Sequence, residues 1–155
     1  MKVNKMKVQV NTIPTVNPNN NKTLNRGRRC EIAVRAEHLG YVEYVCDNVC
    51  FTDGGDLDKG NYFYQVKANR SEISLPKAYR EVATQENYLT TYFELAKANR
   101  YIYVVEVDGV SYEIIMSKLE FINFTKKFYR YNASRKEYRI NILDTTILNW
   151  ARLNV

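Results

Sequence analysis

The chain has 155 residues, a formal net charge of +6 and an isoelectric point of about 9.2. This length is most simply one domain with its own core, and no apolar run reaches the roughly 18 residues that a transmembrane helix needs. The basic charge permits contact with a phosphate backbone without requiring it, so composition leaves enzymes and binding proteins open.

The N-terminal sequence and the cysteines predict a cytoplasmic protein. Met1–Lys5 is basic but is not followed by the apolar segment of a signal peptide. Cys30, Cys46 and Cys50 are expected to be reduced thiols, because an odd number without a secretion signal does not indicate disulfides. A zinc site is not expected, since His38 is the only histidine and there is no second cysteine pair.

Residues 1–22 are predicted to form an arm ahead of a domain that spans residues 23–155. Lys5–Ile13 alternates apolar and polar residues, which favours a strand that ends at Pro14. The polar loop Asn17–Asn21 follows. Two interpretations of the arm stay open: a disordered tail, or a strand that pairs with the body of the protein or with a second copy.

A helix is predicted to begin at Thr23 or Asn25 and to run to Leu39, where Gly40 ends it. Glu31 lies beside the apolar stripe of this helix, on an adjoining face with Arg35 and His38. One interpretation is that Glu31 pairs with a neighbouring arginine on a solvated face.

Arg28 and Arg29 lie near the start of this helix, where the helix dipole does not favour cations. A phosphate partner would explain their position. Ordinary surface charge is the alternative interpretation.

The stretch that ends at Lys67 brings polar groups together. Asp58–Asn61 is typical of a hairpin turn, and Tyr62–Lys67 is rich in strand-forming residues. Because side chains alternate along a strand, Gln65 and Lys67 are expected to point the same way. The hairpin can return Asp56 to their side, so a carboxylate, an amide oxygen and an ammonium group would converge.

Such a trio suits a divalent cation and a phosphate. Mg²⁺ or Mn²⁺ prefers oxygen ligands, which Asp56 and the Gln65 amide could provide. Lys67 could orient or help deprotonate a water molecule, or neutralise charge on the phosphorus. Asp53 is a rival ligand to Asp56.

The rest of the chain predicts a mixed sheet with helices. The predicted helices are Pro76–Ala83, Gln85–Asn99, one starting at the Ser117–Glu120 capping box with Phe121, Ile122, Phe124, Thr125 and Phe128 inward, and a last one with Ile147, Leu148, Trp150, Ala151 and Leu153 inward. The other predicted strands are Tyr41–Phe51, Tyr101–Val107, Val110–Met116 after an Asp108–Gly109 turn, and Tyr138–Ile142. A helix between the Lys67 strand and the Tyr101 strand predicts a parallel crossover.

Two groups of basic residues are candidates for contact with nucleic acid. Arg70, Lys77 and Arg80 follow the Lys67 strand and could form a phosphate rim. The second group is interleaved with Phe128, Tyr129, Tyr131 and Tyr138, and its predicted contacts are Lys126, Lys127, Arg130, Arg135 and Lys136. Ordinary solvated surface is the alternative for each group.

The pattern resembles the active site of the PD-(D/E)XK nuclease superfamily, in which an Asp and a spacer precede Glu/Asp/Gln-x-Lys. Asp56 and Gln65-Val66-Lys67 match it with eight residues between them, although Gly55 replaces the proline of the motif and Gln replaces the commoner Glu. The resemblance covers about residues 25–116. It implies a restriction-endonuclease-like α/β fold in a single domain. It also implies a metal ion that is held by Asp56, Gln65, the Val66 carbonyl and Glu31. Glu37 is the weaker alternative to Glu31.

The expected function is therefore metal-dependent hydrolysis of phosphodiester bonds in double-stranded DNA, site-specific as in restriction or homing enzymes. A homodimer is expected, because one small protomer does not readily cut both strands. The first alternative is a DNA- or protein-binding protein that keeps the nuclease fold without catalysis, such as a phage-encoded inhibitor of a host nuclease of the anti-CRISPR type. The second is a structural subunit of a larger complex.

Overall fold

The computed structural model describes residues 7–13, 57–59 and 62–155. Two β-sheets and four helices are found in this part. The predictions that lie outside it are the helix ending at Leu39, the strand Tyr41–Phe51, the candidate site residues Glu31, Glu37, Asp53 and Asp56, and the cations Arg28 and Arg29.

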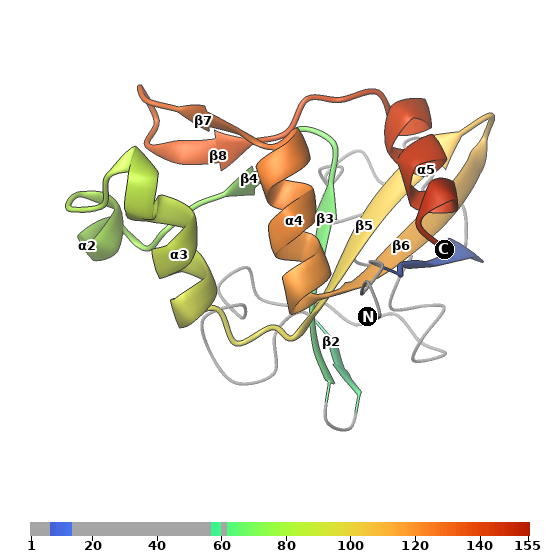
Figure 1. Ribbon diagram of the computed structural model, residues 1–155, viewed down its shortest axis with the longest axis horizontal. Helices are drawn as coiled ribbons and strands as arrows, with labels where there is room; N and C mark the ends of the chain where they lie inside the picture. Colours follow the sequence, from blue (N-terminus) through green and yellow to red (C-terminus); the bar gives the residue numbers. More distant parts are fainter. Residues whose placement is uncertain (1–6, 14–56, 60–61) are drawn as a thin grey trace, which may run out of the picture.

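The larger sheet is mixed and has five strands in the order β1-β6-β5-β3-β2 (Figure 1). The strands are β1 (Gln9–Ile13), β2 (Leu57–Lys59), β3 (Tyr62–Ala68), β5 (Arg100–Val107) and β6 (Val110–Ser117). β3 and β5 are parallel, and the other neighbours are antiparallel. The predicted parallel crossover and the mixed sheet are confirmed.

Both predicted hairpins are present. Asp108 and Gly109 have φ values of 53° and 75°, the left-handed conformation that a two-residue hairpin turn requires. They join Val107 to Val110, which pair across β5 and β6. The earlier hairpin joins β2 to β3, and its turn residues Gly60 and Asn61 lie outside the described residues.

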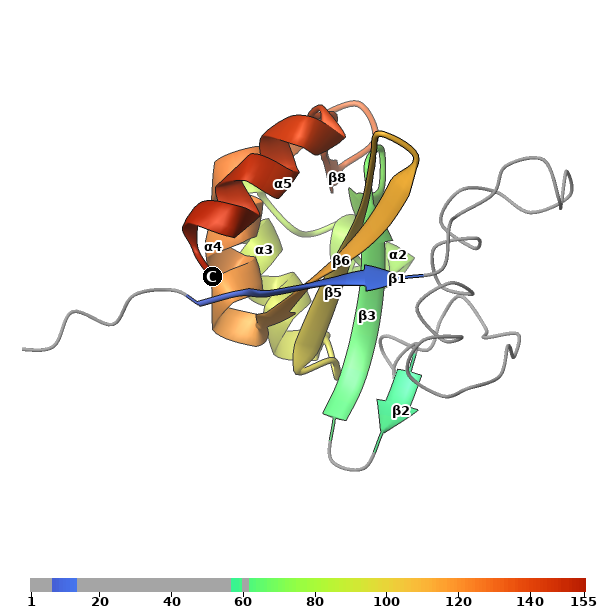
Figure 2. The same ribbon diagram turned by 90° about the vertical axis from the view of Figure 1, so that its right-hand side faces the viewer.

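The three longer helices lie on one side of the larger sheet (Figure 2). The helices are α2 (Lys77–Arg80), α3 (Gln85–Leu95), α4 (Lys118–Phe128) and α5 (Asp144–Leu153). The predicted capping box of α4 is confirmed: the Glu120 amide donates to Ser117 Oγ at 3.2 Å, and the Ser117 amide donates to Glu120 Oε1 at 3.1 Å. These bonds satisfy amides that a helix start otherwise leaves unpaired.

Three helix predictions are corrected at their ends. α2 stops at Arg80 rather than Ala83, and α3 stops at Leu95 because Ala96 is extended, with ψ 128°. Leu153 was expected to face inward but is 87% exposed. It follows the buried Ala151 by two positions, which places it on the far side of α5, since each residue turns the helix by about 100°.

The smaller sheet has three short strands in the order β4-β8-β7. They are β4 (Glu72–Ile73), β7 (Arg130–Asn132) and β8 (Glu137–Arg139). β8 ends before the predicted Ile142, because Ile140 instead exchanges backbone hydrogen bonds with Arg70 and Ser71. The chain after α4 forms the β7–β8 hairpin, which lies with α2 and α3 as a lobe at one end of the molecule (Figure 1).

Aromatic rings fill the core between the helices and the larger sheet. Phe121 stacks on Tyr101 with ring centroids 4.2 Å apart and an interplanar angle of 2°. Phe124 lies between Tyr103 at 5.1 Å and Trp150 at 5.2 Å. Several of the tyrosines are thus part of the core. Each buried ring there removes a large apolar area from water.

The predicted strand in the arm pairs with the body of the protein. Gln9 lies opposite Ile115, and the register continues to Ile13 opposite Ser111. The Val8 amide donates to the carbonyl of Asn154 at 2.8 Å, which ties this strand to the end of α5. No helix in the described part combines the length and the apolar character needed to cross a bilayer.

Candidate functional site

Gln65 and Lys67 share one face of β3. In the parallel register they lie beside Tyr101 and Tyr103, which belong to the core under the helices. Residues in register on neighbouring strands point to the same face, so Gln65 and Lys67 lie on the helix-covered side of the sheet. The Val66 side chain lies on the opposite face, and only its backbone carbonyl could serve a site formed by Gln65 and Lys67.

Gln65 is a buried polar residue with an unused acceptor. The residue is only 7% exposed, and its Oε1 atom has no hydrogen-bond partner among the described residues. An unsatisfied buried polar atom costs roughly 1–3 kcal/mol, so such atoms are rare in folded proteins. An amide oxygen of this kind is chemically suited to a hard cation such as Mg²⁺.

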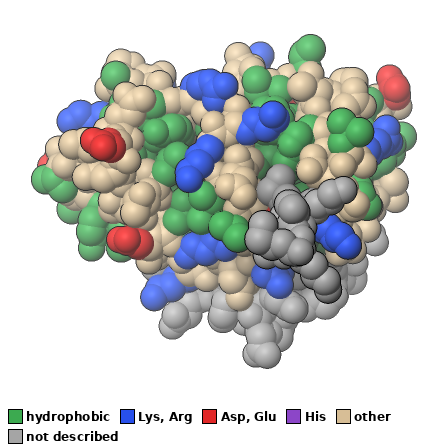
Figure 3. All heavy atoms as spheres, in the orientation of Figure 1, with side chains coloured by type: hydrophobic (Ala, Val, Ile, Leu, Met, Phe, Trp, Pro, Cys, Tyr) green, Lys and Arg blue, Asp and Glu red, His purple; other side chains and the backbone are tan. Residues whose placement is uncertain are grey.

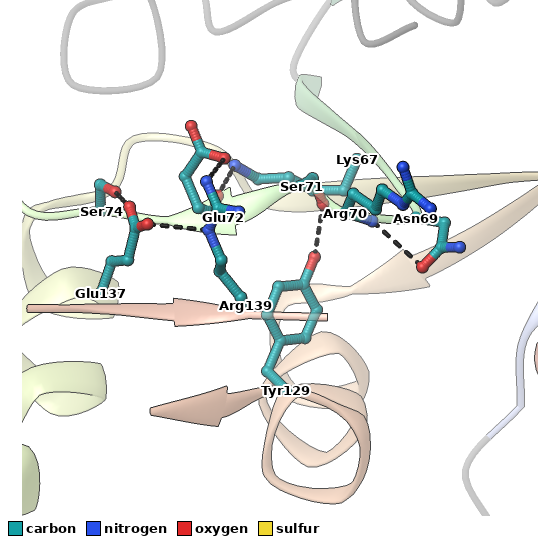
Figure 4. Close-up of polar contacts among 9 residues, drawn as sticks. All are labelled: Lys67, Asn69, Arg70, Ser71, Glu72, Ser74, Tyr129, Glu137 and Arg139. Atoms are coloured by element: carbon teal, nitrogen blue, oxygen red, sulfur yellow. Dashed lines mark hydrogen bonds and ion pairs between the residues drawn. The ribbon is translucent and has the colours of Figure 1, made fainter. Parts of the chain in front are cut away.

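Lys67 is half-buried and makes one hydrogen bond within the described part of the chain. Its Nζ donates to the backbone carbonyl of Glu72 at 2.8 Å. An ammonium group carries three donors, so this bond leaves two for water or for phosphate oxygens. The bond also fixes the direction of the side chain along the end of β3, toward β4 (Figure 4).

The acidic residues expected at this site are not described. Asp56 and Glu31 lie outside the described residues, although β2 begins at Leu57, which pairs with Tyr64 immediately before Gln65. Within the described ranges, no group of three or more His, Cys, Asp or Glu side chains could hold a metal ion.

A polar network next to Lys67 was not predicted from the sequence. Arg139 Nε donates to Glu137 Oε1 at 2.8 Å and its Nη2 lies 3.8 Å from Glu72 Oε2, while Ser74 Oγ donates to Glu137 Oε2 at 2.8 Å (Figure 4). Lys67 joins it through the Glu72 carbonyl. The pairing of β4 with β8 brings these residues together, and two strands this short leave no pattern in the sequence that could have indicated it.

Tyr129 closes the other side of the β3 end. Its hydroxyl lies 3.0 Å from Ser71 Oγ (Figure 4). Burial raises the pKa of Tyr129 well above its ordinary value, and the hydrogen bond to Ser71 opposes this only in part. Tyr129 is therefore a neutral hydroxyl at physiological pH, positioned beside the residues that follow Lys67.

The predicted phosphate rim is divided between two places. Arg70 is exposed at the end of β3, where it lines a hollow of about 500 Å³ with Asn69, Glu106 and the start of α5. Arg80 lines a different hollow, of about 400 Å³, with Arg135 and Lys136. The structure thus brings Arg80 together with the second basic group, a combination that sequence spacing did not indicate.

The aromatic residues of the second basic group do not form a stacking surface. Phe128 and Tyr129 are only 8% and 2% exposed, and Tyr131 and Tyr138 pack on each other and on Tyr88. The predicted inward position of Phe128 is confirmed, and Tyr129 is buried as well, so neither ring is open to a base. They alternate with surface cations because one side of α4 and its continuation faces the core.

The cations at the end of α4 remain on the surface. Lys126, Lys127 and Arg130 are exposed, and Arg130 Nη1 donates to the carbonyls of Lys127 and Tyr129, each at 2.9 Å. Lys and Arg side chains gather over α4 in the middle of the face shown in Figure 3, whereas Asp and Glu side chains lie toward its margins. This face is therefore locally more basic than the molecule as a whole.

The comparisons with known proteins leave the resemblance as a prediction. The chain matches no protein-family model, no curated protein and no solved structure.

Proposed function

We propose that the protein hydrolyses phosphodiester bonds of DNA with Mg²⁺ or Mn²⁺, at a site made by Gln65, Lys67, Asp56 and Glu31. The observation that carries the proposal is the pair of side chains on one face of β3: an amide oxygen without a hydrogen-bond partner among the described residues, two positions from an ammonium group that donates to one described carbonyl. The order of the elements also supports it: the β2–β3 hairpin follows Asp56 in the sequence, and Gln65-Val66-Lys67 lies on β3, which the parallel crossover joins to β5. The spacer and the Gln-x-Lys part of the motif therefore fall on a hairpin and a strand.

Each residue has a defined task in this proposal. The Gln65 oxygen and the carboxylates of Asp56 and Glu31 hold the metal ion, with the Val66 carbonyl as a further ligand. The metal ion would supply a Lewis acid that stabilises charge on the phosphate. Lys67 holds the attacking water or a phosphate oxygen with its remaining donors, while its bond to Glu72 keeps the ammonium group in position.

The test is cleavage of supercoiled plasmid and of synthetic duplexes with each metal ion. Lys67→Ala and Asp56→Ala should each lower the rate by on the order of a hundredfold or more, as expected when one group that stabilises the transition state is removed. Lys97→Ala is the matched control, because Lys97 is an exposed lysine outside the helices and strands. Equal rates for Lys67→Ala and Lys97→Ala would end the proposal.

Gln65→Glu distinguishes two possible roles of Gln65, a metal ligand and a residue that serves only the core. A carboxylate at this position adds charge to the ligand set and should lower the Mg²⁺ concentration needed for half-maximal cleavage. If Gln65 serves the core alone, the buried carboxylate only destabilises the protein, and the dependence on Mg²⁺ stays unchanged.

Cutting both strands calls for two copies of the protein, so we also expect a symmetric dimer on DNA. Light scattering with and without a duplex measures this, and a monomer that nicks only one strand would contradict it.

A binding protein without catalysis is the second candidate. Two observations favour it: position 65 carries a neutral amide, and the Lys67 ammonium already donates to the Glu72 carbonyl. This candidate predicts tight binding to DNA, or inhibition of another nuclease, with no cutting in either metal ion.

A further inference from the structure

The lobe with the smaller sheet carries a hollow that is separate from Gln65 and Lys67. Its volume is about 400 Å³, and its lining consists of Arg80, Ser134, Arg135, Lys136 and Glu137. Arg80 is the last residue of α2, and the others belong to the turn and second strand of the β7–β8 hairpin. Residues more than fifty positions apart thus converge on one concave surface.

The charge balance of this hollow is strongly positive. Within the described residues, no side chain forms an ion pair with Arg80, Arg135 or Lys136. Glu137 is the only acidic residue of the lining, and its two oxygens accept from Arg139 and Ser74, each at 2.8 Å. Three cations close together repel one another unless an anion lies between them, so the hollow is electrostatically suited to an anionic ligand.

Hydrogen bonds hold the backbone that carries the cations. Asn132 Oδ1 accepts from Ser134 Oγ at 2.7 Å and from the Arg135 amide at 3.1 Å, which fixes the turn. The Arg80 amide donates to the Pro76 carbonyl at 2.9 Å at the end of α2. Burial raises the pKa of Tyr88, and the nearby Arg80 charge partly opposes this, which agrees with a guanidinium group that faces the lobe.

We propose that this hollow binds a phosphate group of a nucleic-acid backbone. Two guanidinium groups and an ammonium group provide the donors that phosphate oxygens accept. Lys77 lies three positions before Arg80 and is exposed, so it extends the positive surface along α2 toward a neighbouring phosphate. A chain of phosphates uses both places, whereas a single free phosphate uses the hollow alone.

The identity of this ligand rests on the proposed function, because a nuclease binds nucleic acid. The residues of the hollow are not those of the proposed catalytic site. The polar network from Lys67 through Glu72 and Arg139 ends at Glu137, which also lines the hollow. The same lobe therefore contacts the candidate site at one side and presents the hollow at the other. A backbone held there would anchor DNA without touching the residues that act on it.

The test is binding of a fluorescent DNA duplex, followed by anisotropy over a range of salt concentrations in EDTA, so that no cleavage interferes. The triple variant Arg80→Ala/Arg135→Ala/Lys136→Ala should bind on the order of tenfold or more weakly, and its salt slope should fall by about 0.9 for each phosphate that the variant no longer neutralises. Lys97→Ala, the matched control, should change neither quantity.

Two further variants separate the possible failures. Arg135→Glu/Lys136→Glu alters only exposed turn residues. It should also bind DNA more weakly, and it therefore tests the hollow even where the triple variant fails to fold. Cleavage by Lys67→Ala is a separate readout: retained cleavage refutes the proposed catalysis and leaves the hollow intact, whereas weaker binding by the two hollow variants supports the hollow whatever the cleavage result. Unchanged affinity and slope in both hollow variants, or no binding by the wild type, would overturn the assignment.

Discussion

Contacts between α4 and the larger sheet are made by aromatic rings, whereas contacts between β4 and β8 are made by charged side chains. Phe121 and Tyr101 are fully buried and stacked. Glu137 is buried as well, but its partner Arg139 keeps 40% of its side chain exposed. The difference shows that the charged edge of the lobe keeps contact with water, whereas the apolar core, which also includes Ile73 and Tyr88 of the lobe, is closed to it.

The largest effect is expected where the rings are removed. Phe121→Ala should lower the free energy of unfolding by about 3–5 kcal/mol, because it deletes a fully buried ring and leaves a cavity. Leu119→Ala in the same helix is the control, since Leu119 is 69% exposed and its loss should cost less than about 0.5 kcal/mol. Urea denaturation measures both, and equal costs would show that α4 does not pack as described.

Breaking the charged contact should cost less. Glu137→Ala should lower the free energy of unfolding by about 1–3 kcal/mol, because Arg139 and Ser74 lose a charged acceptor. Glu86→Ala is the control, as Glu86 is exposed on α3. Hydrogen exchange should also quicken in β4 and β8 before it quickens in β5, and uniform quickening would contradict an independent polar lobe.

Tyr129 joins the two regions and predicts a dependence on alkaline pH. Its pKa is raised in the folded protein, so its contribution to stability is complete below the unfolded value of about 10 and is lost as the pH rises above it. The loss should approach about 1.4 kcal/mol per pH unit. Tyr129→Phe removes this titration, and thermal unfolding across the alkaline range should show a shallower decline; an unchanged decline would assign it to other groups.

The smallest effect is expected at Gln65, and it has the opposite sign. Gln65→Met keeps the length of the side chain and removes the unpartnered oxygen, so unfolding should become harder by about 1 kcal/mol. Gln85→Met on the exposed start of α3 should leave stability unchanged. A loss of stability in Gln65→Met would mean that the amide makes contacts that its burial does not reveal.

Much of the described fold follows from local sequence. Asp108–Gly109 can adopt the left-handed turn, and Ser117 and Glu120 can satisfy each other's amides, so the β5–β6 hairpin and the start of α4 were predictable from a few residues. The shared face of Gln65 and Lys67 follows from strand alternation alone. The parallel pairing of β3 with β5 required only that a helix lie between them.

The rest depends on partners that are distant in the sequence. β4 has two residues and exists because it pairs with β8, so its own sequence is ambiguous. Arg139 looks like ordinary surface charge in the sequence, although it binds Glu137 and Glu72. The neighbourhood of Arg80 and Arg135 likewise comes from packing of the lobe, and the burial of Gln65 depends on the neighbouring layers rather than on its own strand.

The bond from the Val8 amide to the Asn154 carbonyl has a consequence for how the protein is made. The first strand cannot reach its final partners until both β6 and the end of α5 have left the ribosome, because it pairs with Ile115 and contacts Asn154. During synthesis the first strand stays without its partners for most of the chain's length, and an open strand edge invites pairing with other chains. Slow translation before β6 has emerged should therefore increase aggregation of nascent chains more than a pause after it.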